Sequence, residues 1–136
     1  MSGLPKGRIV SVQVGKPRGM VADDGKRWRS AIAKEPVLGP VRLVGENFEG
    51  DYQANRKYHG GPDKAVCFFP LERMVGLGEP LGLTLGPGAF GENLTVEGLT
   101  EDDVCIGDTI EAGSIRLQVS QPRMPCANII KRWSSR

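Results

Sequence analysis

Glycine and proline interrupt this chain too often for long helices or long strands to form. The 136 residues include 19 glycines and 10 prolines. Glycine supplies turn conformations and proline removes a backbone donor, so both tend to end regular elements. The pattern predicts a β-rich fold, all-β or α+β, in which one or two short helices accompany many short strands. Strands at this spacing are typical of a closed or nearly closed β-barrel.

The length predicts a single domain over residues 1–136, large enough to bury a hydrophobic core. A formal net charge of +2 is too small to indicate a nucleic-acid partner. No apolar run approaches the roughly 18 residues of a membrane span, and the residues from Met1 to Gly7 lack an apolar signal region. We therefore expect a cytoplasmic protein that binds neither nucleic acid nor membrane. The three cysteines lack CxxC spacing, which argues against a disulfide framework and a structural zinc.

Several segments show the polar–apolar alternation or the apolar runs that are typical of strands. In chain order the expected strands are Arg8 to Val14, Ser30 to Lys34, Val37 to Val44, Lys64 to Phe69, Glu92 to Glu97, and a hairpin of Thr109 to Ala112 with Ile115 to Ser120. The run from Lys64 to Phe69 is continuously apolar after its first residue, which predicts a buried central strand. Pro70 is expected to open a helix through about Leu77.

The segment from Gln121 to Cys126 leaves the last expected strand along a path that two prolines stiffen. A thiolate is a soft metal ligand and a strong nucleophile. Arg123, three residues earlier, is suited to lowering the thiol pKa or to holding a phosphate. These polar flanks favour a functional role for Cys126. Cys67 and Cys105 lie among apolar residues and are expected to pack in the core.

Two further polar stretches are not explained by the needs of a β-fold. The stretch from Gly50 to Lys64 contains His59, the only histidine, beside a pair of glycines. The stretch from Gly88 to Leu94 places Asn93, with both an amide donor and an acceptor, beside a glycine-rich turn. Each also has a purely structural interpretation, in which His59 caps a turn, Lys64 is a solvated strand end and Asn93 is turn chemistry.

These stretches belong to an ordered series that covers nearly the whole chain. The series is Ser30-Ala31-Ile32-Ala33-Lys34, Glu49-Gly50-Asp51-Tyr52-Gln53-Ala54, His59-Gly60-Gly61-Pro62-Asp63-Lys64-Ala65-Val66, Phe90-Gly91-Glu92-Asn93-Leu94, Gly107-Asp108 and Gln121-Pro122-Arg123-Met124-Pro125-Cys126. The ordered set resembles the MOSC domain family, named for the C-terminal type of domain in molybdenum cofactor sulfurases. It is most similar to the bacterial branch whose characterised members reduce N-hydroxylated purines.

The resemblance implies a pyruvate-kinase-type β-barrel that holds a molybdenum cofactor. In that family the cysteine corresponding to Cys126 is the protein ligand to molybdenum, which suits a metal already bound by the sulfurs of a pterin dithiolene. The family reduces N-hydroxylated compounds, and the cofactor carries the redox step. Cleavage of an N–O bond forms water and needs protons, so His59 is the candidate to deliver one. Cys126 and His59 are accordingly the expected catalytic residues.

The resemblance also implies a set of residues that hold the cofactor. Lys34 and Arg123 would bind the pterin phosphate or its pyran oxygens through charge-assisted hydrogen bonds. Asn93 would hydrogen-bond the pterin ring. Lys64 would line the pocket, and Gln121 would serve either the pocket or its own strand end.

The sequence therefore favours an enzyme, a molybdenum-dependent reductase of small N-hydroxylated compounds. The alternative is a non-catalytic module that carries the cofactor, or a sulfur on Cys126, for a partner protein, and a third reading is a vestigial family member without cofactor. No flavin, haem or iron–sulfur motif is visible, so electrons are expected from a separate donor protein. Pyridoxal phosphate would belong only to a partner sulfurase domain.

The chain departs from the family pattern after Cys126. Relatives of this type usually continue well beyond the cysteine, whereas this sequence stops at Arg136, so it reads as shortened at the C-terminus. Trp133 on a short terminal helix would present an apolar surface. We therefore expect self-association, as a homodimer, or an added subunit.

Overall fold

The computed structural model describes residues 6–22, 24–54, 57 and 60–123 of the chain. The strands are β1 (Arg8–Val14), β2 (Arg18–Val21), β3 (Arg27–Ser30), β4 (Glu35–Pro36), β5 (Leu43–Val44), β6 (Asn47–Phe48), β7 (Phe68–Pro70), β8 (Leu94–Glu97), β9 (Thr109–Ala112) and β10 (Ile115–Gln118). Helix α2 (Leu71–Gly78) and the 3-10 turns η1 (Pro62–Lys64) and η2 (Glu79–Leu81) complete the elements. The β-rich α+β class is confirmed, and no closed barrel is found among the described residues.

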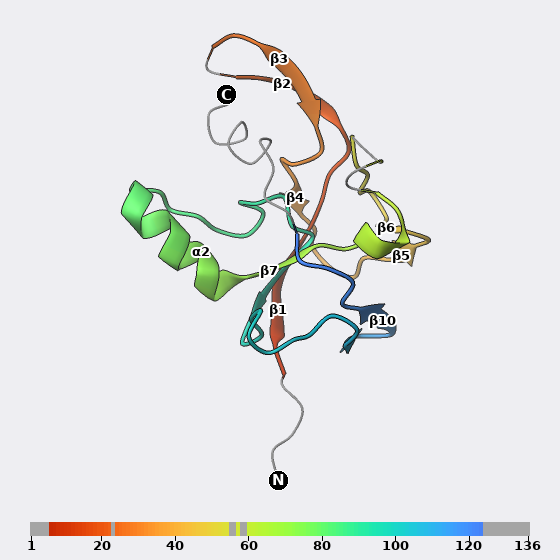
Figure 1. Ribbon diagram of the computed structural model, residues 1–136. Coiled ribbons are helices and arrows are strands. Elements are labelled where there is room, and N and C mark those ends of the chain that lie inside the picture. Colours follow the sequence, from red (N-terminus) through yellow and green to blue (C-terminus); the bar gives the residue numbers. More distant parts are fainter. Residues whose placement is uncertain (1–5, 23, 55–56, 58–59, 124–136) are drawn as a thin grey trace.

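A four-stranded sheet in the order β4-β1-β8-β7 forms the centre of the molecule. In it β1 runs antiparallel to both β4 and β8, whereas β7 runs parallel to β8. Three two-stranded sheets, β2–β3, β5–β6 and β9–β10, surround it. Figure 1 shows α2 to one side of the central strands and the β2–β3 hairpin projecting from one end. Apart from Leu94, which begins β8, the described parts of the polar segments considered above lie outside the strands, in the connections that precede or follow them.

The hydrophobic core sits where β8 meets the neighbouring pairs of strands. Phe48, Leu94 and Val96 form its buried centre. The partly buried side chains packed against this centre are Val12, Val14, Val41, Leu43, Val66, Phe68, Ile115 and Leu117. They come from the central sheet, from β5–β6 and from β9–β10, so one core ties three of the four sheets together.

The expected central strand from Lys64 to Phe69 is wrong in both its bounds and its position. Only Phe68–Pro70 forms β7, which is half-buried and lies at the edge of the sheet. The reason is that η1 takes up Lys64, while the backbone N–H of Cys67 donates to the side chain of Asn93 at 3.0 Å. That side-chain bond replaces a strand-to-strand bond, so regular pairing starts one residue later.

Two other strand predictions are also largely wrong. The segment after Ser30 is irregular because Ile32 N–H donates to Ser30 Oγ at 3.1 Å and Lys34 N–H to Ile32 O at 3.0 Å. Between Val37 and Val44 only β5 is a strand, since Gly39 has φ of +87° and a proline follows it. The β2–β3 hairpin, which turns through Gly25 at φ +82°, was not expected.

The other predicted strands and the helix after Pro70 are confirmed, although β8 begins at Leu94 and β10 ends at Gln118. The expected terminal helix with Trp133 lies outside the described residues. Strand β1 has the predicted bounds, α2 begins directly after Pro70, and β9 and β10 form the predicted hairpin. Cys105 differs from expectation, because it is exposed rather than packed in the core. Within the described residues no helix is both long and apolar enough to cross a membrane.

Candidate functional site

A buried carboxylate, Asp51, joins three separate segments of the chain. Its Oδ1 accepts hydrogen bonds from Lys34 Nζ at 2.6 Å and from the backbone N–H of Gly15 at 2.9 Å. Its Oδ2 accepts from Asn93 Nδ2 at 3.0 Å. The side chains of Lys34 and Asp51 are only 7% and 0% exposed. Because a buried charge is tolerated only when it is paired and hydrogen-bonded, this arrangement fixes all three partners.

The side chain of Asn93 is fully engaged within the protein. Besides its bond to Asp51, Nδ2 donates to Gln13 O at 3.2 Å, and Oδ1 accepts from the backbone N–H of Cys67 at 3.0 Å. The backbone N–H of Asn93 donates to Cys67 O at 2.8 Å. Asn93 therefore links β1 to the entry of β7, and its amide would have to break a bond in order to donate to a ligand.

A second buried carboxylate, Glu92, shapes the glycine-rich loop. It accepts from the backbone N–H groups of Gly88 at 2.8 Å and Phe90 at 3.1 Å, and from Thr95 Oγ1 at 2.5 Å. The Nε2 group of Gln13 bridges Glu92 and Thr95 at 3.2 and 2.8 Å. Gln13 is fully buried, and its Oε1 has no hydrogen-bond partner in the described structure. Hydrogen bonds from side chains of the central sheet thus hold the loop in place.

The loop is also held on its other side. Gly91 has φ of +70°, and a Cβ there would lie 2.6 Å from Ile32 Cγ1, so only glycine fits between the loop and the segment before Lys34. The rings of Phe69 and Phe90 stack with centroids 4.6 Å apart. The backbone from 88 to 93 is therefore rigid.

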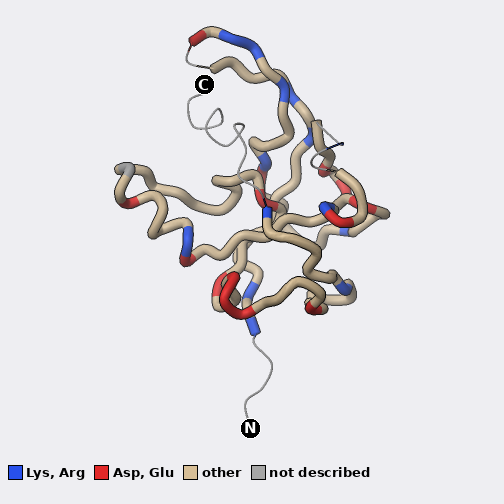
Figure 2. Tube along the Cα trace, viewed as in Figure 1, with Lys and Arg blue, Asp and Glu red and all other residues tan. Residues whose placement is uncertain are grey.

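Arg123 reaches this loop from the chain beyond β10. Its Nη1 donates to Phe90 O and lies 3.8 Å from Cys67 Sγ. Burial raises the pKa of the Cys67 thiol, while the charge of Arg123 opposes that rise. Glu92 raises and Lys34 lowers the same pKa, so these charged groups surround the thiol. In Figure 2 blue and red segments meet at the centre of the molecule.

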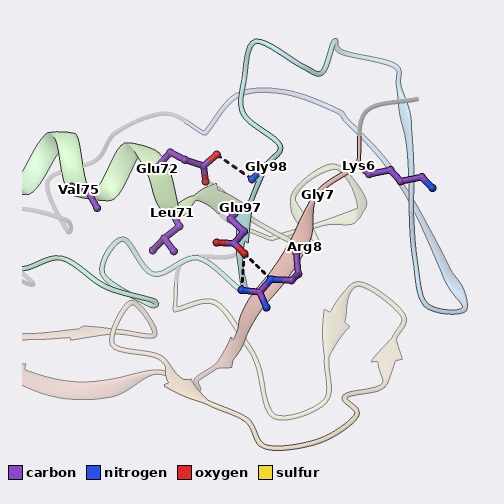
Figure 3. Close-up of a pocket in the computed structure, with 8 residues that line it drawn as sticks. All are labelled: Lys6, Gly7, Arg8, Leu71, Glu72, Val75, Glu97 and Gly98. Carbon is purple, nitrogen blue, oxygen red and sulfur yellow. Dashed lines mark hydrogen bonds and ion pairs between the residues drawn. The ribbon is translucent and has the colours of Figure 1, made fainter. Parts of the chain in front are cut away.

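Gln121 lies at a second place, the exit of β10, and Lys64 is the last residue of the neighbouring η1 turn. A depression of about 390 Å³ there is lined by Asp63, Ile106, Gly107, Gln118, Val119, Ser120 and Gln121. Ser120 Oγ donates to Asp63 O, which ties the η1 turn to this exit. Lys64 and Gln121 are both exposed. A larger depression of about 740 Å³, between α2 and the start of β1, contains none of the predicted site residues (Figure 3).

The structure thus brings Lys34, Asn93 and Arg123 together, and sets Lys64 and Gln121 beside the depression at the β10 exit. His59 and Cys126, the two expected catalytic residues, lie outside the described residues. Over residues 6–22, 24–54, 57 and 60–123, no group of three or more His, Cys, Asp or Glu side chains is placed to hold a metal ion.

Sequence reasoning gave no role to several residues that build this site. Asp51, Glu92 and Gln13 supply most of its buried hydrogen bonds, and Cys67 contacts Arg123. Asp51 and Glu92 both stand in the quoted motifs. The glycine that precedes each of them was the available sequence signal for this role, because a carboxylate beside a turn glycine can accept from nearby backbone N–H groups.

The chain belongs to the MOSC domain family. The family profile, described as "MOSC domain", matches residues 55–136, which is more than half of the sequence. The match includes the strand β8, the β9–β10 hairpin and the segment leading to Cys126.

Three relatives and one solved structure agree with this assignment. YflK of Bacillus subtilis is 48% identical over 125 residues, covering 92% of this chain and 56% of YflK. YiiM of Escherichia coli is 43% identical, covering 88% of this chain and 50% of YiiM. A protein of Gibberella moniliformis named "Reductase" is 36% identical, covering 80% of this chain and 20% of that protein. The crystal structure of YiiM from Geobacillus stearothermophilus superposes with a TM-score of 0.70 at 40% identity, covering 94% and 57%.

The chain spans about half the length of the curated bacterial relatives it matches.

Proposed function

We propose that this MOSC domain binds a molybdenum cofactor and takes part in the reduction of N-hydroxylated compounds. Membership of the MOSC family supports the cofactor, and a relative named "Reductase" supports the reaction class. The observation that carries the proposal is the placement of Arg123, which lies three residues before Cys126 in the sequence. Its guanidinium donates to Phe90 O in the rigid glycine-rich loop.

The chemistry of the described residues fits an anionic pterin group at this place. Arg123 hydrogen-bonds to described residues through Nη1, and its guanidinium also carries N–H groups on Nε and Nη2 that would donate to an anion. A half-buried guanidinium is well suited to a phosphate, because the planar fork offers two parallel donors. Lys34 adds no net charge, since Asp51 neutralises it. Arg123 is therefore the cation that would hold the anionic group.

The other residues have separate tasks in this proposal. Cys126 would supply the soft sulfur ligand to the metal. When bound, the cofactor supplies the electrons that reduce an N–O bond. Lys64 and Gln121, at the β10 exit, would line the approach for substrate, and His59 would deliver a proton to the departing oxygen. A separate donor protein would pass electrons to the cofactor.

A carrier that holds the cofactor, or a sulfur on Cys126, without turnover is the second candidate. It is favoured by the burial of Asn93 and Lys34 and by their bonds to Asp51, which give both side chains a structural task. A cytoplasmic location and self-association or an added subunit stay predictions for either function.

Molybdenum per chain, measured by elemental analysis, tests the proposal. The protein is made in a host with an intact cofactor supply, and Cys126→Ser is prepared beside it. Near-stoichiometric metal that is lost in the variant would support binding and identify the ligand. Absence of metal from both proteins would overturn the proposal. Turnover of an N-hydroxylated base with an artificial electron donor then separates the reductase from the carrier.

A further inference from the structure

We infer that Asp51 is a positioning residue for the proposed cofactor site, and that it acts through Asn93 and Cys67 on Arg123. The inference rests on the proposed function. It assigns to Asp51 an effect on cofactor retention although its buried carboxylate touches only protein groups.

The first step is the orientation of the Asn93 amide. A carboxylate only accepts hydrogen bonds, so Asp51 Oδ2 requires the Nδ2 end of the amide to face it. The Oδ1 end must then face the other way, toward the backbone N–H of Cys67, where it accepts at 3.0 Å. The backbone carbonyl of Gln13, which accepts from the same Nδ2 at 3.2 Å, favours the same orientation. A neutral amide at position 51 would therefore remove one of the two acceptors that impose it, the one that carries a charge.

The second step runs from Cys67 to Arg123. Asn93 holds the backbone of Cys67 at both its N–H and its C=O, which places the Cα–Cβ bond from which Sγ projects. Sγ is 3.8 Å from Arg123 Nη1, and the same nitrogen donates to Phe90 O. The guanidinium therefore rests on two supports that the buried network holds in place. A guanidinium held in this way loses less freedom when a ligand binds, and such preorganisation favours binding.

The charge of Asp51 supports the position of Arg123 in addition to its hydrogen bonds. The Asp51 carboxylate balances the ammonium of Lys34. The charges of Lys34 and Arg123 both act on the Cys67 thiol and lower its pKa. Removing the negative charge would leave Lys34 as an unbalanced buried cation near Arg123. Both the aim of the guanidinium and its electrostatic surroundings would change.

The test compares the rate at which bound molybdenum is lost from the folded, loaded full-length chain. Wild type, Asp51→Asn and Asp103→Asn are dialysed well below their unfolding temperatures, and the metal that remains is measured by elemental analysis. Outer residues that support ligating groups typically change metal affinity by about ten- to a hundred-fold, and we expect loss about that much faster in Asp51→Asn. Asp103 is exposed, and its Oδ2 accepts from the backbone N–H and the Oγ1 of Thr100 at 2.8 and 3.2 Å in a surface turn, so its variant should match wild type.

A double-mutant comparison separates positioning from general weakening of the fold. Asp51→Asn is repeated in an Arg123→Ala background. If Asp51 acts through Arg123, it causes little further acceleration there. Acceleration by the same factor in both backgrounds would overturn the inference. So would an unchanged rate of loss in a folded Asp51→Asn protein.

Cys67→Ala keeps the test decisive if Asp51→Asn does not fold. This variant retains the backbone bonds to Asn93 and removes only the sulfur beside Arg123. Faster loss in Cys67→Ala supports the relay, and an unchanged rate overturns it. Wild type that never holds molybdenum would instead refute the proposed function, which distinguishes the two failures.

Discussion

The ion pairs Arg8–Glu97 and Lys34–Asp51 have the same N···O distance, 2.6 Å, and opposite surroundings. Arg8 and Glu97 pair across β1 and β8 at the rim of the sheet, with side chains 73% and 40% exposed (Figure 3). Lys34 and Asp51 are 7% and 0% exposed. The first pair is a contact between two neighbouring strands, whereas the second also holds Gly15 and Asn93.

The comparison teaches that burial and shared partners, rather than distance, decide what an ion pair does. Water and salt screen the exposed pair, so either partner can be lost at little cost. Loss of one partner from the buried pair leaves a charge without solvation and releases other hydrogen bonds. The candidate site is built around the second kind of pair.

The largest expected difference follows from neutralising one acid in each pair. Asp51→Asn should lower the free energy of unfolding by about 3–5 kcal/mol, because Lys34 is left as an unpaired buried charge. Urea denaturation at neutral pH measures the change. The matched variant is Glu97→Gln, and equal losses in the two proteins would contradict the comparison.

The same contrast can be made with backbone positions. Gly91→Ala should lower the free energy of unfolding by about 1–3 kcal/mol, because φ is +70° and the new Cβ would meet Ile32 at 2.6 Å. Gly113, in the exposed β9–β10 turn, has φ of +58° and open space around a Cβ. Gly113→Ala should therefore be the milder change by thermal unfolding. A larger loss at Gly113 would contradict the rigid packing of the loop.

A pH titration of stability distinguishes the buried thiol from the exposed one. The pKa of Cys67 is raised by burial, so the folded protein holds this proton at pH values where the unfolded chain has released it. Stability should fall as pH rises from the ordinary thiol range toward the raised pKa, by about 1.4 kcal/mol per unit of difference. Cys67→Ala should lack this fall and Cys105→Ala should keep it, as seen by urea midpoints. A fall that follows Cys105 would refute the assignment.

The smallest effect belongs to the exposed pair itself. Glu97→Gln should lower stability by roughly 0.2–1 kcal/mol at low salt, and by less at high salt, where the pair is screened. Denaturation in both buffers checks this. A loss independent of salt would show that the pair acts other than by its charge.

Local patterns predicted the elements that local forces determine. Alternation located β1 to the residue, a proline marked the start of α2, and Gly113 marked the β9–β10 turn. The β2–β3 hairpin had a turn signal at Gly25 that was overlooked. The apolar run before Phe69 led to a strand prediction that was too long, because periodicity does not reveal that the Cys67 N–H donates to the Asn93 side chain.

The site shows the same limit more strongly. The family motifs brought Lys34, Asn93 and Arg123 to attention, and these residues do converge. The glycine before Asp51 indicated an acceptor for nearby backbone N–H groups, but no local pattern indicated which distant residues the carboxylate would bind. Its bonds to Lys34, Gly15 and Asn93 span 17, 36 and 42 residues of chain, so only the tertiary fold assembles them.

The antiparallel pairing of β1 with β8 has a consequence for the way the chain is made. Arg8 and Glu97 are 89 residues apart, so β1 cannot pair with β8 until the ribosome has added the intervening sequence. At about 5–20 residues per second, the wait is on the order of 4–18 seconds. Throughout it, one edge of a half-apolar strand is open to any other nascent chain. We expect the yield of this domain in cells to rise when chaperones that shield such edges are abundant, and synthesis rate to matter more than growth temperature.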